Sequence, residues 1–275
     1  MQRVVLVVDA EVDASQQQVT SSPTIERMVA ALRQAILVEP AGASTSQPSV
    51  GNPALFAAAT PSIQVFSVSQ LIHLEAIDHA SLLSLGRKEK SDQVFFCPLT
   101  LNLPNLFTWP GQTIYQQCRE VDVLRQLVEQ QFAWGTGDGY YWLPIVLTAR
   151  GPLYGEVIAL AAEQGGDKAW DELSQFSFCQ PLHVSDVWRQ PLYELGFRLL
   201  RSLAAPPATY LLQFGFQGQT ICFDRLWPFP AAPAIASLHV QTPDLFACHW
   251  LCLTRQPIRD LVIAASAPYQ VLQSG

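Results

Sequence analysis

The pattern of apolar and polar positions begins with a strand and continues with a helix. Residues 3–9 hold the uninterrupted apolar run from Val4 to Val8, which predicts a buried strand. Apolar residues then recur at helical spacing between Ser22, a residue type that caps helices, and Pro40, where a helix must end.

In the middle of the chain, predicted strands again alternate with predicted helices. Residues 62–75 predict a strand that leads into a short helix, and residues 92–101 predict a core strand that a proline ends. Residues 111–133 carry the strongest helical stripe of the chain, and the glycine-rich turn at 135–139 stops it.

The C-terminal half is dominated by predicted strands. We expect strands over residues 140–148, 153–162, 209–215, 219–224, 234–240 and 245–253, and a helix that begins at Ser185 or Asp186 and ends before Pro206. Short glycine-containing connections follow the first and the third of these strands, and each of them predicts a hairpin.

These elements predict an α+β fold, in which a mixed, largely antiparallel sheet packs with several amphipathic helices, because the regular strand–helix–strand alternation of a doubly wound sheet is missing. We expect one domain over residues 1–275. A flexible loop is predicted at 40–61, where Pro, Ala, Gly, Ser and Thr dominate. A subdivision into residues 1–136 and 137–275 is the alternative.

The charge content limits the classes of partner. Charged residues make up 14% of the chain, against roughly 25% in a typical soluble domain. The net charge is −7, and the basic residues form no concentrated patch, which disfavours nucleic-acid binding. A surface poor in charge is less protected against association, so we expect a protein partner or self-association.

No apolar run is long enough to span a membrane, and the start of the chain lacks the pattern of a signal peptide, so we expect a cytoplasmic protein. Several of the six cysteines lie inside apolar runs, which predicts free buried thiols. The cysteines are Cys97, Cys118, Cys179, Cys222, Cys248 and Cys252.

Two acids follow the first predicted strand and form the sharpest catalytic candidate. Asp9 and Glu11 are one residue apart, so in an extended chain they point to the same side and can share Mg²⁺. The glycine and threonine that usually follow such acids in phosphatase and exonuclease motifs are absent. A strand that ends in a polar loop explains the same residues.

Cys248, His249 and Cys252 are candidate metal ligands. Structural zinc usually needs four ligands from two paired clusters, and no second pair is present. The alternative is that these side chains simply pack in the core. Nor do the glycine-containing turns at 135–139 and 215–218 predict a nucleotide site, because a phosphate-binding loop must precede a helix.

The strongest binding candidates lie where aromatic residues and prolines alternate. Proline fixes the backbone and lowers the entropy lost on binding, and Trp and Arg are frequent interface anchors. The candidate binding residues are Asp224, Arg225, Trp227, Phe229 and Trp109. The alternative is a well-packed loop that covers the core.

The sequence therefore predicts a cytoplasmic, non-enzymatic protein that binds a protein partner or assists assembly through its Trp/Pro-rich surface loops. The sequence leaves open whether the protein is an enzyme, although it favours a protein without enzymatic activity. One alternative is a Mg²⁺-dependent hydrolase that uses Asp9 and Glu11, and another is a small-molecule-binding sensor domain. No cofactor is predicted for the non-enzymatic protein, and only the alternative hydrolase would require Mg²⁺.

Overall fold

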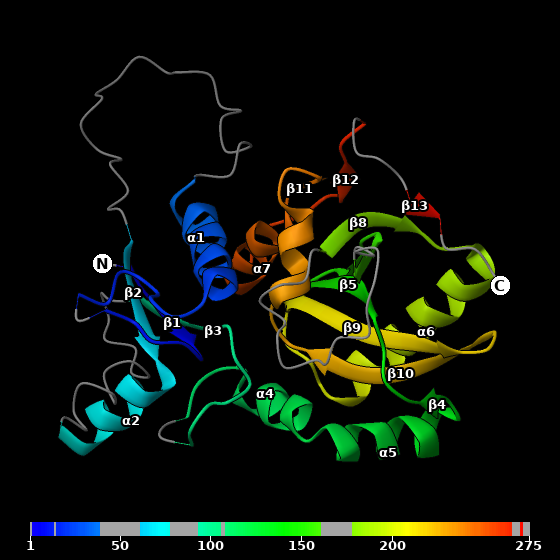
Figure 1. The fold of residues 1–275 in the computed structure, drawn as a ribbon, viewed down its shortest axis with the longest axis horizontal. Coiled ribbons are helices and arrows are strands. Elements are labelled where there is room, and N and C mark those ends of the chain that lie inside the picture. The colour runs from blue at the N-terminus through cyan, green and yellow to red at the C-terminus, as the bar shows by residue number, and fades with distance from the viewer. Residues whose placement is uncertain are drawn as a thin grey trace.

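A computed structural model describes residues 2–13, 15–38, 61–77, 93–105, 108–160, 178–265 and 270–271. The loop predicted at 40–61 lies outside these residues except for its last position. The described chain builds two main sheets with helices around and between them (Figure 1).

The N-terminal sheet is parallel. It contains β1 (Gln2–Val8), β2 (Ser62–Ser67) and β3 (Gln93–Pro98) in the order β2-β1-β3, and β1 pairs in parallel with both neighbours. The unbroken apolar run of β1 is explained by this central position, because a parallel strand is covered on both faces. The sequence-based expectation of no strand–helix–strand alternation is wrong for this part of the chain.

Helix α1 (Pro23–Leu37) begins as predicted. The Ser22 side chain caps it and accepts a hydrogen bond from the Ile25 amide at 3.4 Å. Helix α2 (Val68–Ile77) continues directly from β2. Leu71 of α2 packs with Val5 and Val7, which belong to a small cluster on one face of the N-terminal sheet.

The larger sheet has eight strands in the order β13-β8-β7-β5-β9-β10-β4, with β6 paired to β5. Its strands are β4 (Gly135–Thr136), β5 (Tyr141–Thr148), β6 (Gly151–Tyr154), β7 (Val157–Leu160), β8 (Phe178–His183), β9 (Ala208–Gln217), β10 (Thr220–Trp227) and β13 (Gln270–Val271). Only the β10–β4 and β13–β8 pairs of this described sheet are parallel. The predicted α+β fold with a mixed, largely antiparallel sheet is confirmed.

Three helices, α4 (Gln112–Arg119), α5 (Val121–Phe132) and α6 (Asp186–Ser202), flank this sheet, and a fourth, α7 (Leu245–Leu253), lies between it and the N-terminal part of the chain. Helices α4 and α5 run along β10 (Figure 1), whereas α7 contacts α1, β5 and β9. Among the described helices, none is long and apolar enough to cross a membrane.

The strands predicted at 234–240 and 245–253 are wrong. The first segment is largely a 3₁₀ helix, η2 (Ala232–Ser237), and the second is α7. Asp244 caps α7 and accepts hydrogen bonds from the Phe246 and Ala247 amides, both at 2.9 Å. Helix α7 is buried on most of its sides, so its sequence carries no polar face from which a helical period can be read.

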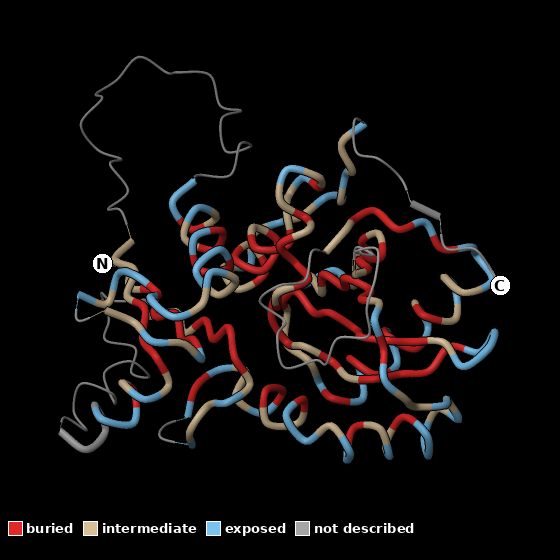
Figure 2. The backbone as a smooth tube through the Cα atoms, in the orientation of Figure 1, coloured by how far each residue is buried: buried red, intermediate tan, exposed pale blue. Residues whose placement is uncertain are grey.

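One hydrophobic core joins the two sheets. Buried residues concentrate along β5, β9, β10 and α7 (Figure 2). Phe95 of β3 contacts Trp250 of α7, with ring centroids 5.1 Å apart. Leu6 of the N-terminal sheet belongs to the same core cluster as Leu211 of β9. The division of the chain into one or two domains stays a prediction.

Candidate active site

Two polar residues are buried beside the bulge of the β9–β10 hairpin. Gln213 interrupts the apolar sequence of β9, and Asp224 interrupts that of β10. The strand register shifts between Phe223 and Arg225, so Asp224 is an extra, bulged residue. A buried carboxylate or amide is costly unless it is hydrogen-bonded, so both side chains need partners.

The Asp224 carboxylate has three donors. Its Oδ1 accepts hydrogen bonds from Nη2 of Arg125 at 2.6 Å and from Nε of Arg225 at 3.1 Å. Its Oδ2 accepts from the Gly139 amide at 3.0 Å. Nε of Arg125 also donates to the Asp224 carbonyl at 3.1 Å. With only 3% of its side chain exposed, Asp224 is a fully partnered buried anion.

Gln213 is held by the same segments. Its Nε2 donates to the Gly139 carbonyl at 2.7 Å, and its Oε1 accepts from Nε1 of Trp227 at 2.9 Å. A Cβ atom on Gly139 would lie 2.2 Å from the carbonyl carbon of Phe214, so only glycine permits this approach of the turn to β9.

We call this set of residues the Asp224 cluster. Its members are Arg125, Asp138, Gly139, Gln213, Asp224, Arg225 and Trp227. They come from α5, the turn before β5, β9 and β10, so the cluster ties four parts of the chain together.

The two arginines of the cluster reach solvent. Their side chains are 23% exposed for Arg125 and 34% for Arg225. Burial lowers the pKa of Arg125, but hydrogen bonds and ion pairs with Asp224 and Asp138 outweigh it, so the net shift of this pKa is upward. The guanidinium of Arg225 lies 5.8 Å from the centre of the Trp227 ring. Arg125 therefore stays cationic, and both arginine side chains remain accessible to an anion.

The five binding residues predicted from sequence lie in one chain of contacts. Trp227 contacts Phe229 at 6.0 Å between ring centroids, Phe229 stacks on Tyr115 at 5.7 Å, and Tyr115 contacts Trp109 at 5.0 Å. Asp224, Phe229 and Trp109 are buried, so they are not a surface loop. A binding role for these residues stays a prediction.

Asp9 and Glu11 do not converge with other acids. Asp9 follows β1, is exposed, and its Oδ2 accepts a hydrogen bond from Nδ2 of Asn102 at 2.6 Å. Glu11 is exposed too. Within the described residues there is no group of three or more acids, histidines or cysteines that could hold a metal ion. The Mg²⁺ site expected for a hydrolase has no support in this geometry.

Cys248, His249 and Cys252 are buried on α7. Cys248 donates to the Pro243 carbonyl at 3.5 Å, and Nδ1 of His249 accepts from the Thr209 amide at 3.3 Å. Burial raises the pKa of Cys252 to about 12, raises that of Cys248, and lowers that of His249 to about 3. These side chains pack in the core, as the alternative interpretation of the sequence expected.

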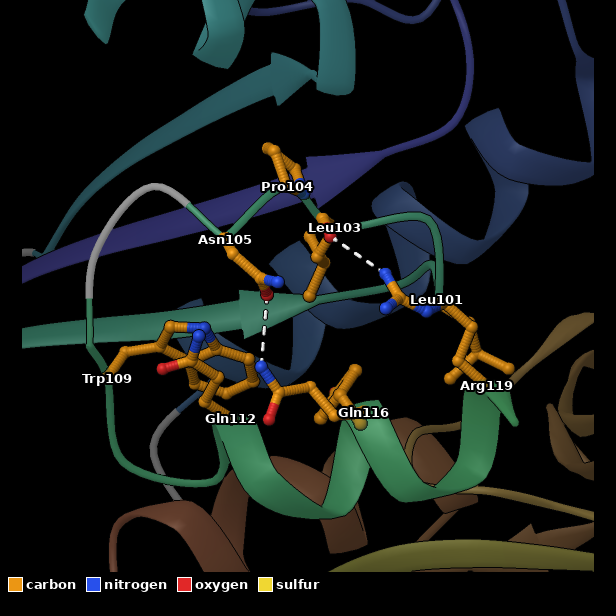
Figure 3. A pocket seen from close by; sticks show the side chains of 9 residues that line it. Leu101, Leu103, Pro104, Asn105, Trp109, Gln112, Gln116 and Arg119 are labelled. Carbon is orange, nitrogen blue, oxygen red and sulfur yellow. Dashed lines mark hydrogen bonds between the residues drawn. The ribbon is translucent and has the colours of Figure 1, made fainter. Parts of the chain in front are cut away.

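A small pocket near the end of β3 is almost filled by the side chains that line it. In Figure 3, Gln116 of α4 donates a hydrogen bond to Asn105 at 3.0 Å, and Arg119 donates to the Leu103 carbonyl at 3.4 Å. The remaining volume is about 10 Å³, which is at most the space of one water molecule. This pocket is too small for a substrate.

Three residues of the cluster, Arg125, Gly139 and Gln213, are not predicted from the sequence. The signal for Gln213 is a single amide inside an apolar strand, which needs a buried partner. Arg125 and Gly139 carry no comparable local signal, because their partner Asp224 is 99 and 85 residues away in the chain.

No protein-family model and no curated protein matches this chain. Solved structures do share its fold. N5-carboxyaminoimidazole synthetase from Staphylococcus aureus, complexed with ADP, has a TM-score of 0.58 at 9% identity and covers 95% of this chain and 79% of its own. Glycinamide-RNase-transformylase T from Mycobacterium tuberculosis has a TM-score of 0.56 at 13% identity and covers 93% and 80%. A putative ATP-grasp superfamily protein from Archaeoglobus fulgidus has a TM-score of 0.51 at 9% identity and covers 100% and 97%.

These similarities correct the functional prediction. A non-enzymatic protein that binds a partner through Trp/Pro-rich loops is contradicted, because the solved structures that share the fold of this chain include enzymes, a synthetase and a transformylase. The expectation of no cofactor is not supported either, since the Staphylococcus aureus structure holds ADP.

Proposed function

We propose that this chain is an ATP-dependent enzyme of the synthetase type, which binds the phosphates of an adenine nucleotide at the Asp224 cluster. The observation that carries this proposal is the correspondence of 95% of the chain to a synthetase structure complexed with ADP. A shared fold alone does not fix a function, so the site must supply the chemistry.

The Asp224 cluster supplies groups that suit phosphate. The chain has a net charge of −7, so a polyphosphate is repelled overall and needs local cations. All three lysines lie outside the described residues, whereas Arg125 and Arg225 lie side by side on one carboxylate and are partly exposed. Guanidinium groups bind phosphate oxygens through paired, charge-assisted hydrogen bonds.

Asp224 acts here as a positioning residue. Because its carboxylate accepts from both arginines, it fixes the two guanidinium groups before any nucleotide arrives. The Gly139 amide holds the second carboxylate oxygen and keeps the carboxylate in place. Bound ATP would supply a phosphoryl group whose transfer drives formation of a new bond.

The described residues do not fit a protein-bound metal ion. Both oxygens of Asp224 are committed to donors of the protein, and no described group of three or more ligand side chains converges. We therefore assign no step to a metal held by the protein.

Calorimetric titration with ATP and with ADP tests the proposal. We expect the wild-type protein to bind both nucleotides, and Arg225→Met to bind them about tenfold more weakly or worse, because a charge-assisted hydrogen bond is lost. Arg201→Met is the matched control, since exposed Arg201 of α6 is outside the cluster. Wild-type protein that binds neither nucleotide, or equal losses in both variants, would contradict the proposal.

We also propose a cytoplasmic location and self-association. The location is supported by five buried cysteines that are free thiols, namely Cys97, Cys118, Cys222, Cys248 and Cys252. Self-association is supported by the low charge content and by Val187 and Phe197 of α6, which are 79% and 47% exposed. Light scattering after size exclusion tests the second proposal, because a strictly monomeric protein would exclude it.

A further inference from the structure

A cavity of about 180 Å³ lies where β3, α4, α7 and the start of β9 meet. Four aromatic side chains contribute to its walls: Phe96, Trp109, Tyr115 and Tyr210. Prolines line it as well, so its walls are stiff. A cavity of about 150 Å³ with apolar walls is known to bind benzene, so this volume suits a single ring with a small substituent.

Most polar groups of the cavity wall are already satisfied. The Tyr115 hydroxyl donates to the Pro98 carbonyl at 2.9 Å, and the Tyr210 hydroxyl donates to the Pro206 carbonyl at 2.6 Å. The Cys252 thiol stays protonated at neutral pH because burial raises its pKa to about 12. These groups leave the wall largely apolar.

His249 supplies an unused donor. Its Nδ1 accepts a hydrogen bond from the Thr209 amide at 3.3 Å, so the proton of the neutral ring is on Nε2, at the opposite edge. The side chain is only 2% exposed and lines the cavity. No described residue accepts a hydrogen bond from Nε2. An acceptor atom of a ligand in the cavity would give this donor a partner.

Arg255 places a cation at the same cavity. It follows the C-terminus of α7 with φ of 56°, a left-handed conformation that favours glycine. Its side chain is exposed, and it forms no ion pair with the described residues. A strained position thus places a guanidinium that has no ion-pair partner among the described residues beside an apolar cavity.

We propose that this cavity binds a small carboxylic acid that carries one ring. The ring packs among the four aromatic side chains. The carboxylate accepts a hydrogen bond from Nε2 of His249 and is paired with the charge of Arg255. None of the residues that line the cavity belongs to the Asp224 cluster, so this is a second site of the enzyme.

Calorimetric titration with benzoate tests this site, with benzamide as the neutral ligand of the same shape. We expect saturable binding of benzoate and about tenfold weaker binding of benzamide, because the charge-assisted contact with Arg255 is lost. Arg255→Gly removes the cation at a position where glycine is unstrained, so it should fold and bind benzoate about tenfold more weakly.

Two further variants test separately the packing of the ring and the hydrogen bond to the carboxylate. Ala208→Leu fills the cavity from β9 and should abolish benzoate binding while ADP binding persists. His249→Asn keeps an acceptor for the Thr209 amide but has no donor in the place of Nε2, and it should also weaken benzoate binding. Absence of benzoate binding in the wild-type protein, or an unchanged affinity in both Arg255→Gly and Ala208→Leu, would overturn the proposal.

Discussion

Nη2 of Arg125 lies 2.6 Å from Oδ1 of Asp224, although the two residues are 99 positions apart in the chain. This ion pair joins α5 to β10, and the Gly139 amide joins the turn before β5 to the same carboxylate. One buried charge therefore fixes three segments that surround the proposed nucleotide site.

Replacing Asp224 with Asn should destabilise the fold by about 3 kcal/mol. Breaking a buried ion pair typically costs about 3–5 kcal/mol, and the partial exposure of both arginines puts the value at the lower end. The matched control is Asp138→Asn, whose side chain is 77% exposed and which should cost less than about 1 kcal/mol. Urea unfolding measures both, and equal losses would show that Asp224 has no special structural role.

Gly139→Ala should destabilise the protein by at least about 2 kcal/mol, because the new Cβ atom would meet the Phe214 backbone at 2.2 Å. We expect Gly135→Ala, four residues earlier, to change stability by no more than about 0.5 kcal/mol, since a Cβ atom there meets nothing within 4 Å. Thermal unfolding compares the two. A Gly139→Ala protein as stable as Gly135→Ala would show that the turn does not need this close approach.

Ala133→Gly should stabilise the protein by about 0.5–1 kcal/mol. Ala133 ends α5 with φ of 57°, in the left-handed region where a Cβ atom is unfavourable and glycine is not. Ala35→Gly is the opposite control, because it places glycine inside α1 and should cost about 1 kcal/mol. Both values are obtained from the midpoints of denaturant unfolding, provided that the dependence of the unfolding free energy on denaturant concentration is unchanged. A loss of stability in Ala133→Gly would contradict the assignment of this helix end.

Acid should weaken the fold through His249. Burial lowers its pKa to about 3 from an ordinary value of 6.5, so between these pH values the unfolded chain binds the proton and the folded protein does not. Its contribution to stability is full above pH 6.5 and is lost toward pH 3, by about 1.4 kcal/mol for each pH unit.

The readout is the difference between the wild-type protein and His249→Asn, measured as unfolding free energy against pH. The neighbouring thiol of Cys252 and phenol of Tyr210 have raised pKa values and do not titrate in this range. Asp244, whose pKa burial raises, is shared by both proteins and cancels in the difference. Parallel pH profiles of the two proteins would show that His249 is not buried as described.

The sequence predicts correctly those elements that are buried on one side only, or whose ends are marked by clear capping residues. Helix α1 is found because an apolar stripe lies between Ser22 and proline, and the hairpin of β9 and β10 because glycine separates two apolar runs. Helix α7 is missed because it is buried almost all round, which erases the period that separates helix from strand.

The parallel N-terminal sheet and the Asp224 cluster share one reason for being missed. Strand β1 pairs with β2 and β3, which are about 60 and 90 residues away in the chain, and parallel pairing leaves no turn motif between partners. The aromatic surroundings of Asp224 predict a binding residue, but its partners Arg125 and Gly139 come from distant segments. Only the folded chain shows that they meet.

Hydrogen exchange with and without ADP tests most directly whether an adenine nucleotide binds at the Asp224 cluster. We expect ADP to slow amide exchange in α5, in the turn that contains Gly139, and along β9 and β10, and we expect this protection to be lost in Arg225→Met. No change with ADP, or protection confined to the N-terminal strands β1, β2 and β3, would contradict the proposed site.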